Sequence, residues 1–186
     1  MPSQKIETYF KRKGNSNTTS KLFKTRVLDI DAAELAKQLT LHDSYLFNLI
    51  KPVECMNGAW HHEEDWMAVN IKTMLRTSER IKYWIARTII SEREPSKRGF
   101  LISYFINVAT ECINLRNFNT CMAILEGLRI PPIPILRTSW QLVGQKSKQM
   151  FEELKVLMTP AGNFPYYRRR LASLNGDPCV PYLSKR

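Results

Sequence analysis

Apolar residues recur at helical spacing along most of the chain. Asp31 is placed to cap a helix that starts at Ala32, and Glu34 stands at the third position of a capping box. Asp43 has a similar place before a second apolar series, which consists of Tyr45, Leu46, Leu49 and Ile50. The pattern predicts two helices before the loop at Lys51 and Pro52.

A longer amphipathic run follows, from Trp66 to Ile90. Its buried stripe is expected to contain Trp66, Val69, Ile71, Met74, Leu75, Ile81, Trp84 and Ile85. Glu94 and Pro95 end the run, because a residue before proline disfavours the helical conformation whereas proline fits the first turn of a helix. A new helix is therefore predicted near Ser96.

The second half of the chain continues in the same way. The proline-rich segment 131–134 stops a helix whose apolar residues are Met122, Ile124, Leu125 and Leu128. Two more helices are expected at 146–158 and 164–174. No two-residue alternation bounded by hairpin turns, which would indicate strands, is present. The sequence therefore predicts an all-α, multi-helix bundle.

Basic residues concentrate at the N-terminus. The net charge of the chain is +11, and residues 1–28 hold seven Lys or Arg residues against one Glu. Such a polar segment cannot bury a core, so residues 1–28 are predicted to be a disordered basic tail and residues 29–186 a folded domain. Basic tails attract anionic surfaces with little chemical selectivity. An anionic membrane surface is therefore a candidate partner.

A short motif in this tail offers an alternative partner. Ile6, Tyr9 and Phe10 resemble the sliding-clamp-binding box, in which an aliphatic residue precedes two aromatic residues. The box normally begins with Gln, and Ser3 stands at that position. Clamp or nucleic-acid binding is therefore the less favoured interpretation of the tail.

No motif for covalent catalysis or cofactor binding is visible. The chain lacks a phosphate-binding glycine loop, a nucleophile elbow and a His-Glu-x-x-His pair. Cys55 with His61 and His62 does not match the spacing of zinc ligands, so neither a metal nor a cofactor is expected. The chain has no apolar run of the ~20 residues that cross a bilayer and no secretory signal. We expect a non-enzymatic, cytoplasmic protein that the tail can hold peripherally at a membrane.

Several spaced segments match one known family. They read Leu35-Ala36-x-Gln38-Leu39-Thr40-Leu41-x-Asp43-x-x-Leu46-Phe47-x-x-Ile50-x-Pro52-x-Glu54, Phe105-Ile106-x-Val108-Ala109-x-x-Cys112, Leu115-x-Asn117-Phe118-Asn119-x-x-x-Ala123-Ile124, Pro132-Ile133-x-x-Leu136-x-x-x-Trp140 and Pro178-x-Val180-Pro181-Tyr182-Leu183. In order and spacing they resemble the catalytic domain of Ras-type guanine-nucleotide exchange factors. The resemblance implies a Ras-family small GTPase as partner. It also implies nucleotide exchange by binding, in small-GTPase signalling.

Six residues fall at GTPase-binding positions of that family: Thr40, Leu41, Arg76, Asn119, Phe164 and Tyr167. Arg76 and Asn119 match positions that contact the switch regions of the GTPase. Phe164 and Tyr167 match aromatic residues that help to form the pocket for a switch tyrosine. The resemblance implies that Thr40 and Leu41 support this wall.

The residue types also allow simpler roles. Asn117 or Asn119 can cap a helix that begins at Thr120, because Asn is among the best capping residues. Phe118 is expected in the core. Exposed charges such as Arg76 and the arginines at 168–170 are commonly solvated, although residues 168–170 can also form a lipid or phosphate patch.

Departures from the family pattern bear on activity. Ser78 and Glu79 replace Phe and Asn, Lys82 replaces Ser, and Ile135 replaces Arg. Glu79 would place a negative charge beside the switch surface and so repel or retarget the partner. The resemblance ends at Leu183, before the family's helical hairpin, so we expect a domain that is incomplete at its C-terminus and weak in exchange. The alternative is a non-catalytic helical module that binds a GTPase or scaffold protein without exchange.

Overall fold

The computed structural model describes residues 27–61 and 68–183 of the 186-residue chain. In order, its elements are η1 (Val27–Asp29), α2 (Ala32–Asn48), η2 (Pro52–His61), α3 (Val69–Ser91), α4 (Pro95–Asn114), α5 (Phe118–Leu128), η4 (Ile133–Ile135), α6 (Arg137–Gln141), α7 (Gln145–Leu157) and α8 (Pro165–Ala172). Over the described ranges the only β-type pairing is an isolated bridge between Asn117 and Val180. The prediction of an all-α domain is therefore confirmed.

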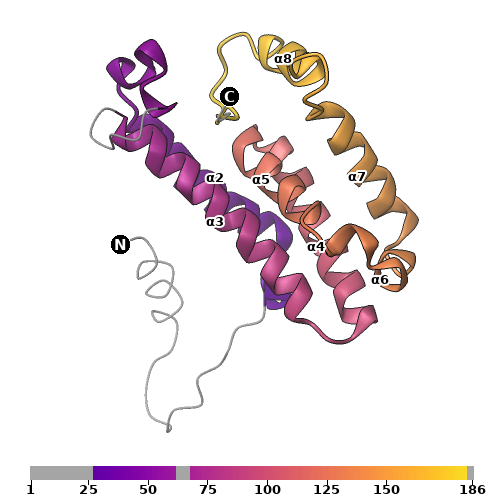
Figure 1. The fold of residues 1–186 in the computed structure, drawn as a ribbon. Helices are drawn as coiled ribbons and strands as arrows, with labels where there is room; N and C mark the ends of the chain where they lie inside the picture. The colour runs from indigo at the N-terminus through magenta and orange to yellow at the C-terminus, as the bar shows by residue number, and fades with distance from the viewer. Residues whose placement is uncertain (1–26, 62–67, 184–186) are drawn as a thin grey trace, which may run out of the picture.

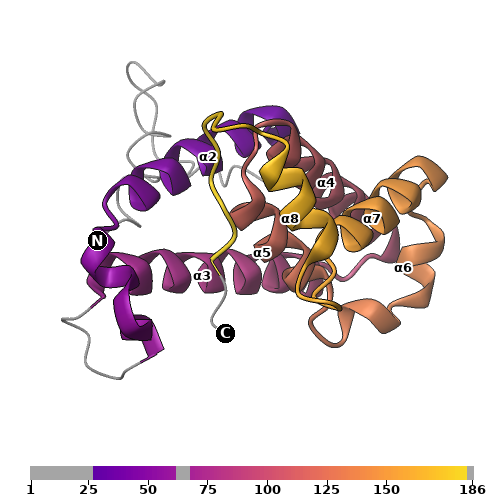
Figure 2. The ribbon, with the colours of Figure 1, turned by 90° about the horizontal axis from the view of Figure 1, so that it is seen from above.

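The helices are arranged around α4 and α5. Helices α2 and α3 lie along one side of this pair, and α6, α7 and α8 lie along the other (Figure 1). After α8 the chain returns across α5 toward α3 (Figure 2). Every residue of α5 except Glu126 is buried as a result. Helix α5 is thus enclosed along nearly its whole length within the described part of the bundle.

Helix α2 is continuous where the sequence suggested two helices. The Asp31 carboxylate caps it by accepting hydrogen bonds from the N–H groups of Ala33 and Glu34, at 3.0 and 3.1 Å. The prediction that Asp43 starts a second helix is wrong, because α2 runs through this residue to Asn48. Asp43 is buried and finds its partners on another helix instead of on the following N–H groups.

The long amphipathic helix and the break after it are confirmed. Helix α3 ends at Ser91, and α4 begins at Pro95. Two members of the expected buried stripe are on the surface instead, since Val69 is exposed and Trp84 is 40% exposed. Successive helical residues are separated by about 100°, so Trp84 points well away from its buried neighbour Ile85. Trp66, also assigned to the stripe, lies outside the described residues.

Other boundaries differ in detail from the prediction. Val27 and Leu28, assigned to the disordered tail, form part of η1, and Val27 packs against the core. The remainder of that tail, its clamp-like box and His62 lie outside the described residues. Helices α7 and α8 follow the two expected segments, whereas η2 and α6 were not anticipated. No helix within 27–61 or 68–183 has the length and apolar character needed to cross a membrane.

We predict that Trp84→Ala lowers the free energy of unfolding by about 1–2 kcal/mol. One side of its ring is exposed to solvent, and the ring makes an edge-to-face contact with Phe105, at 5.5 Å between centroids. The matched variant Phe105→Ala should cost about 3–5 kcal/mol, because this ring is fully buried. Urea unfolding measures both values. Equal losses would contradict the observed orientation of α3.

Candidate functional site

A buried carboxylate joins α2 to the start of α5. Asp43 Oδ2 accepts hydrogen bonds from Asn117 Nδ2 at 3.2 Å, Asn119 Nδ2 at 3.1 Å and Thr120 Oγ1 at 2.6 Å. The positive end of the α5 dipole faces the same carboxylate. Asp43 therefore anchors one end of the central helix.

The first turn of α5 is organised by two asparagines with different roles. Asn117 is the cap, because its Oδ1 accepts the Thr120 N–H at 3.0 Å. Asn119 is only 1% exposed, and its Nδ2 also donates to Ser78 Oγ on α3, at 2.9 Å. Phe118 is buried, as predicted. Asn119 therefore connects α5 to both α2 and α3 and is not the helix cap.

The segment after α8 closes the same corner from outside. The Val180 N–H donates to Arg116 O, and the Phe118 N–H donates to Val180 O, both at 3.0 Å. The Val180 side chain is buried against Leu46 of α2 and Met74 of α3. Three helices therefore meet at the Pro-x-Val-Pro-Tyr-Leu segment.

Aromatic rings connect α8 to this corner. Tyr167 is buried, lies edge-on to Phe118 at 5.1 Å between centroids, and accepts the Tyr182 N–H through its hydroxyl at 3.0 Å. Burial raises the pKa of Tyr167, so the phenol stays protonated at neutral pH. Phe164 has a left-handed backbone, with φ of 56°, and packs against Tyr182 at 5.5 Å between centroids. These rings form a rigid wall beside α5.

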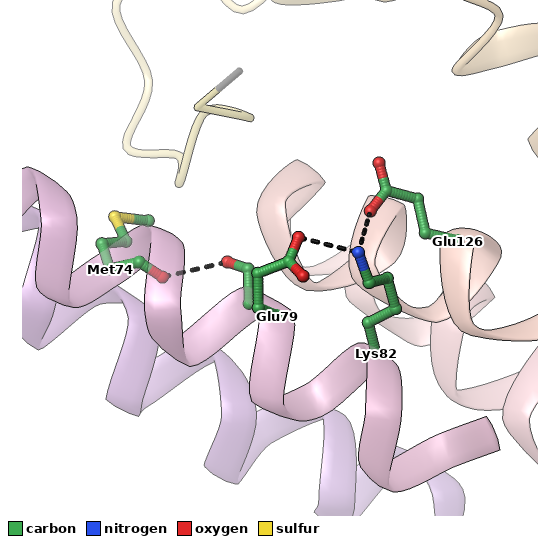
Figure 3. A network of polar contacts seen from close by, with 5 residues as sticks. Met74, Glu79, Lys82 and Glu126 are labelled. Carbon is green, nitrogen blue, oxygen red and sulfur yellow. Dashed lines mark hydrogen bonds and ion pairs between the residues drawn. The ribbon is translucent and has the colours of Figure 1, made fainter. Parts of the chain in front are cut away.

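A charged group lies where α3 meets α5. Lys82 Nζ is 2.7 Å from Glu79 Oε1 and 3.7 Å from Glu126 Oε2 (Figure 3). Burial lowers the pKa of Lys82, but the hydrogen bond and charge of Glu79 and the charge of Glu126 raise it by more. Glu79 and Lys82, both departures from the family pattern, therefore compensate each other's charge.

A second buried carboxylate holds the start of α3. Glu54 Oε2 accepts the N–H groups of Asn70 and Ile71, at 2.8 and 3.2 Å. Glu54 Oε1 accepts the Asn70 side chain at 2.7 Å and the Lys51 N–H at 3.1 Å. Burial raises the pKa of Glu54, whereas these hydrogen bonds lower it by more, so the net shift is downward. This distant residue therefore serves as the cap of α3.

Comparison with known proteins identifies the family. The family model described as "RasGEF domain" matches residues 34–185. The chain belongs to the RasGEF domain family.

Three relatives illustrate the similarity. Ras guanine nucleotide exchange factor Y of Dictyostelium discoideum is 36% identical over 83% of this chain and 10% of the relative. The Rap guanine nucleotide exchange factor of Caenorhabditis elegans is 35% identical over 84% of this chain and 11% of the relative. The Ras-specific guanine nucleotide-releasing factor RalGPS1 of Gallus gallus is 32% identical over 84% of this chain and 27% of the relative. The chain thus spans between about a tenth and about a quarter of these relatives.

The six residues expected to bind a GTPase occupy different depths in this RasGEF domain. Leu41 and Arg76 are exposed, on α2 and α3 respectively. Thr40 and Phe164 are half-buried, and the Thr40 hydroxyl accepts Asn117 Nδ2 at 3.3 Å. Asn119 and Tyr167 are buried, because the polar network and the aromatic wall enclose them. Contact of any of the six with a GTPase remains a prediction.

Three residues that shape the site were missed as site residues. The family spacing included Asp43 and Glu54, but neither was expected to be a buried hydrogen-bond acceptor. Ser78 was noted as a departure, and its hydroxyl accepts from Asn119 and donates to Met74 O at 3.1 Å. The sequence did indicate the burial of Asp43 in one way, because this residue shares a helix face with the apolar residues Ala36 and Leu46. No group of His, Cys, Asp and Glu suited to a metal was found in the described part of this domain.

We predict that Asn119→Ala lowers the free energy of unfolding by about 1–3 kcal/mol with little loss of helicity. The change removes one buried hydrogen bond, to Asp43, and one partly buried hydrogen bond, to Ser78, so each acceptor loses a donor. Asn114→Ala, at an exposed position of α4, is the matched control. Urea unfolding followed by circular dichroism tests the pair. A loss no larger than that of the control would contradict the network's role.

We predict that the contribution of Glu54 to the free energy of unfolding decreases at acidic pH. Because its folded pKa is lowered, its contribution is present above the unfolded pKa of about 4.3 and is lost as pH falls through the folded pKa. Glu54→Gln should destabilise the domain at pH of about 7, and the gap from wild type should narrow at pH of about 3–4. Urea unfolding across this range measures the gap. A gap that is independent of pH would contradict the cap.

Proposed function

We propose that this RasGEF domain binds a Ras-family small GTPase and promotes release of its nucleotide. The observation that carries the proposal is the corner where Asp43 and Asn119 join α2, α3 and α5, because it fixes the position of α3, on which Arg76 is exposed. Buried hydrogen bonds hold these helices in place before a partner binds. Binding then requires little further ordering of the helices, which reduces the entropic cost of association. The names of the relatives, which refer to Ras or Rap guanine nucleotide exchange or to Ras-specific nucleotide release, support the same partner class.

The six candidate residues divide into contacts and supports. Leu41, Arg76 and the accessible edge of Phe164 are the proposed contacts, because their side chains reach the surface. Asn119 and Tyr167 act from beneath, by holding α3 and the aromatic wall in place. Thr40 does both, since it is half-buried and accepts a hydrogen bond from Asn117.

Exchange of this kind requires binding energy and no covalent step. A nucleotide bound at picomolar affinity is held by about 16 kcal/mol, so spontaneous release is slow. A protein that grips the nucleotide-free GTPase more tightly than the loaded form lowers nucleotide affinity by the same factor. We assign the binding surface to α2, α3 and the start of α8, which carry the proposed contacts Leu41, Arg76 and Phe164.

A cytoplasmic location with peripheral membrane contact is part of this proposal. The basic residues within 1–28 and the exposed arginines at 168–170 supply positive charge for an anionic lipid surface. Sedimentation with vesicles of phosphatidylserine and phosphatidylcholine, at low and high salt, tests this point. Equal binding to neutral vesicles that contain only phosphatidylcholine would contradict it.

We predict that Arg76→Ala reduces exchange by about tenfold, or about 1.4 kcal/mol of binding energy. The assay is release of fluorescent GDP from purified Ras-, Rap- and Ral-type GTPases by the full chain. Arg137→Ala is the matched control, because Arg137 is exposed on α6, on the far side of α5 from α3 (Figure 1). Binding that leaves the nucleotide in place would favour the non-catalytic interaction module. Absence of binding to all three GTPases would overturn the proposed function.

A further inference from the structure

Glu126 has an unusual position in the bundle. It is the only residue of α5 that is not buried, and its side chain is 35% exposed. The next residue, Gly127, marks a close approach of two helices, since a Cβ there would lie 2.9 Å from Lys82 O on α3. The carboxylate of Glu126 therefore projects from a backbone that cannot shift without disturbing the α3–α5 packing.

The charges of Glu79, Lys82 and Glu126, taken by themselves, do not cancel. Lys82 donates a hydrogen bond to Glu79 at 2.7 Å, whereas its distance of 3.7 Å to Glu126 is too long for one (Figure 3). Glu126 forms no second ion pair within the described part of the chain. These three residues, here called the α3–α5 triad, carry two negative charges and one positive charge. The excess negative charge falls on Glu126, the member with the longer separation and the greater exposure.

The partial burial of the triad strengthens the electrostatic interactions of this charge. The side chain of Lys82 is only 16% exposed, and a charge pair shielded from water interacts more strongly than one on an open surface. The two carboxylates hold the pKa of Lys82 above its usual value despite burial, so the ammonium stays charged.

We propose that the α3–α5 triad is a specificity site, at which Glu126 selects a GTPase that presents a Lys or Arg side chain opposite α5. The inference rests on the proposed GTPase-binding function and adds a charge requirement to it. The triad follows Arg76 along α3, within one to two turns, so the two positions fit under one protein partner. A GTPase with an acidic residue at the facing position would be repelled, and repulsion is an effective source of specificity.

The test compares affinity of the full chain for nucleotide-free Ras-, Rap- and Ral-type GTPases. For the GTPase that binds best, Glu126→Gln should weaken binding by about tenfold, and Glu126→Lys by more. The matched control is Glu153→Lys, an exposed charge reversal on α7. Binding by wild type should fall with salt more steeply than binding by Glu126→Gln.

Lys82→Met separates selection of a partner from attachment of α3 to α5. If the triad selects by charge, this variant exposes both carboxylates and should bind the same GTPase more tightly at low salt, although its melting temperature falls. Weaker binding in parallel with Glu126→Gln would mean that the triad only joins the two helices, and would overturn the inference. Unchanged binding by Glu126→Lys together with loss by Arg76→Ala would overturn the inference and leave the proposed function standing. Failure of every GTPase to bind would overturn both.

Discussion

The buried carboxylate of Asp43 is the interaction on which the rest of the domain depends. A buried polar group requires hydrogen-bond partners, and all three donors to Asp43 Oδ2 come from the start of α5, whereas the buried Oδ1 has no partner among the described residues. This requirement fixes where α5 begins relative to α2. Through Asn119 and Ser78 it also fixes α3. The polar network thus sets the geometry of a surface that apolar packing alone would leave free to slide.

Around Asp43, the residues that hold the helices together differ from the residues that are exposed on the surface. Asn119, Tyr167 and Glu54 use their polar atoms inside the protein, where they hold helix ends and the returning C-terminal segment. Arg76 and Glu126 stand on the surface that these supports define. A substitution beneath the surface therefore changes stability and function together. For a substitution on it, we expect a change in recognition with little effect on folding.

The sequence predicted those features that depend on nearby residues. Asp31 as a cap, the break at Pro95 and the helical class all follow from short-range rules. Asp43 was assigned as a cap because its partners lie 74 or more positions away, where local rules do not reach. Trp84 was placed in the core because it is apolar and directly precedes the buried Ile85. The helical period does not distinguish such neighbouring positions reliably. The family pattern found the neighbourhood of the site, but the burial of Asn119 depends on how α2, α3 and α5 meet.

The pairing of Val180 with the start of α5 has a consequence for how the chain reaches its folded state. Leu46 and Met74 are covered by a residue roughly 130 and 100 positions further along the sequence, so their contact surfaces stay open until that segment arrives. During synthesis the earlier helices can associate, but the seam between α2 and α3 remains apolar and accessible. The segment around Val180 can cover Leu46 and Met74 only after it has been synthesised, and apolar surface left open until then is of the kind that favours aggregation and chaperone binding.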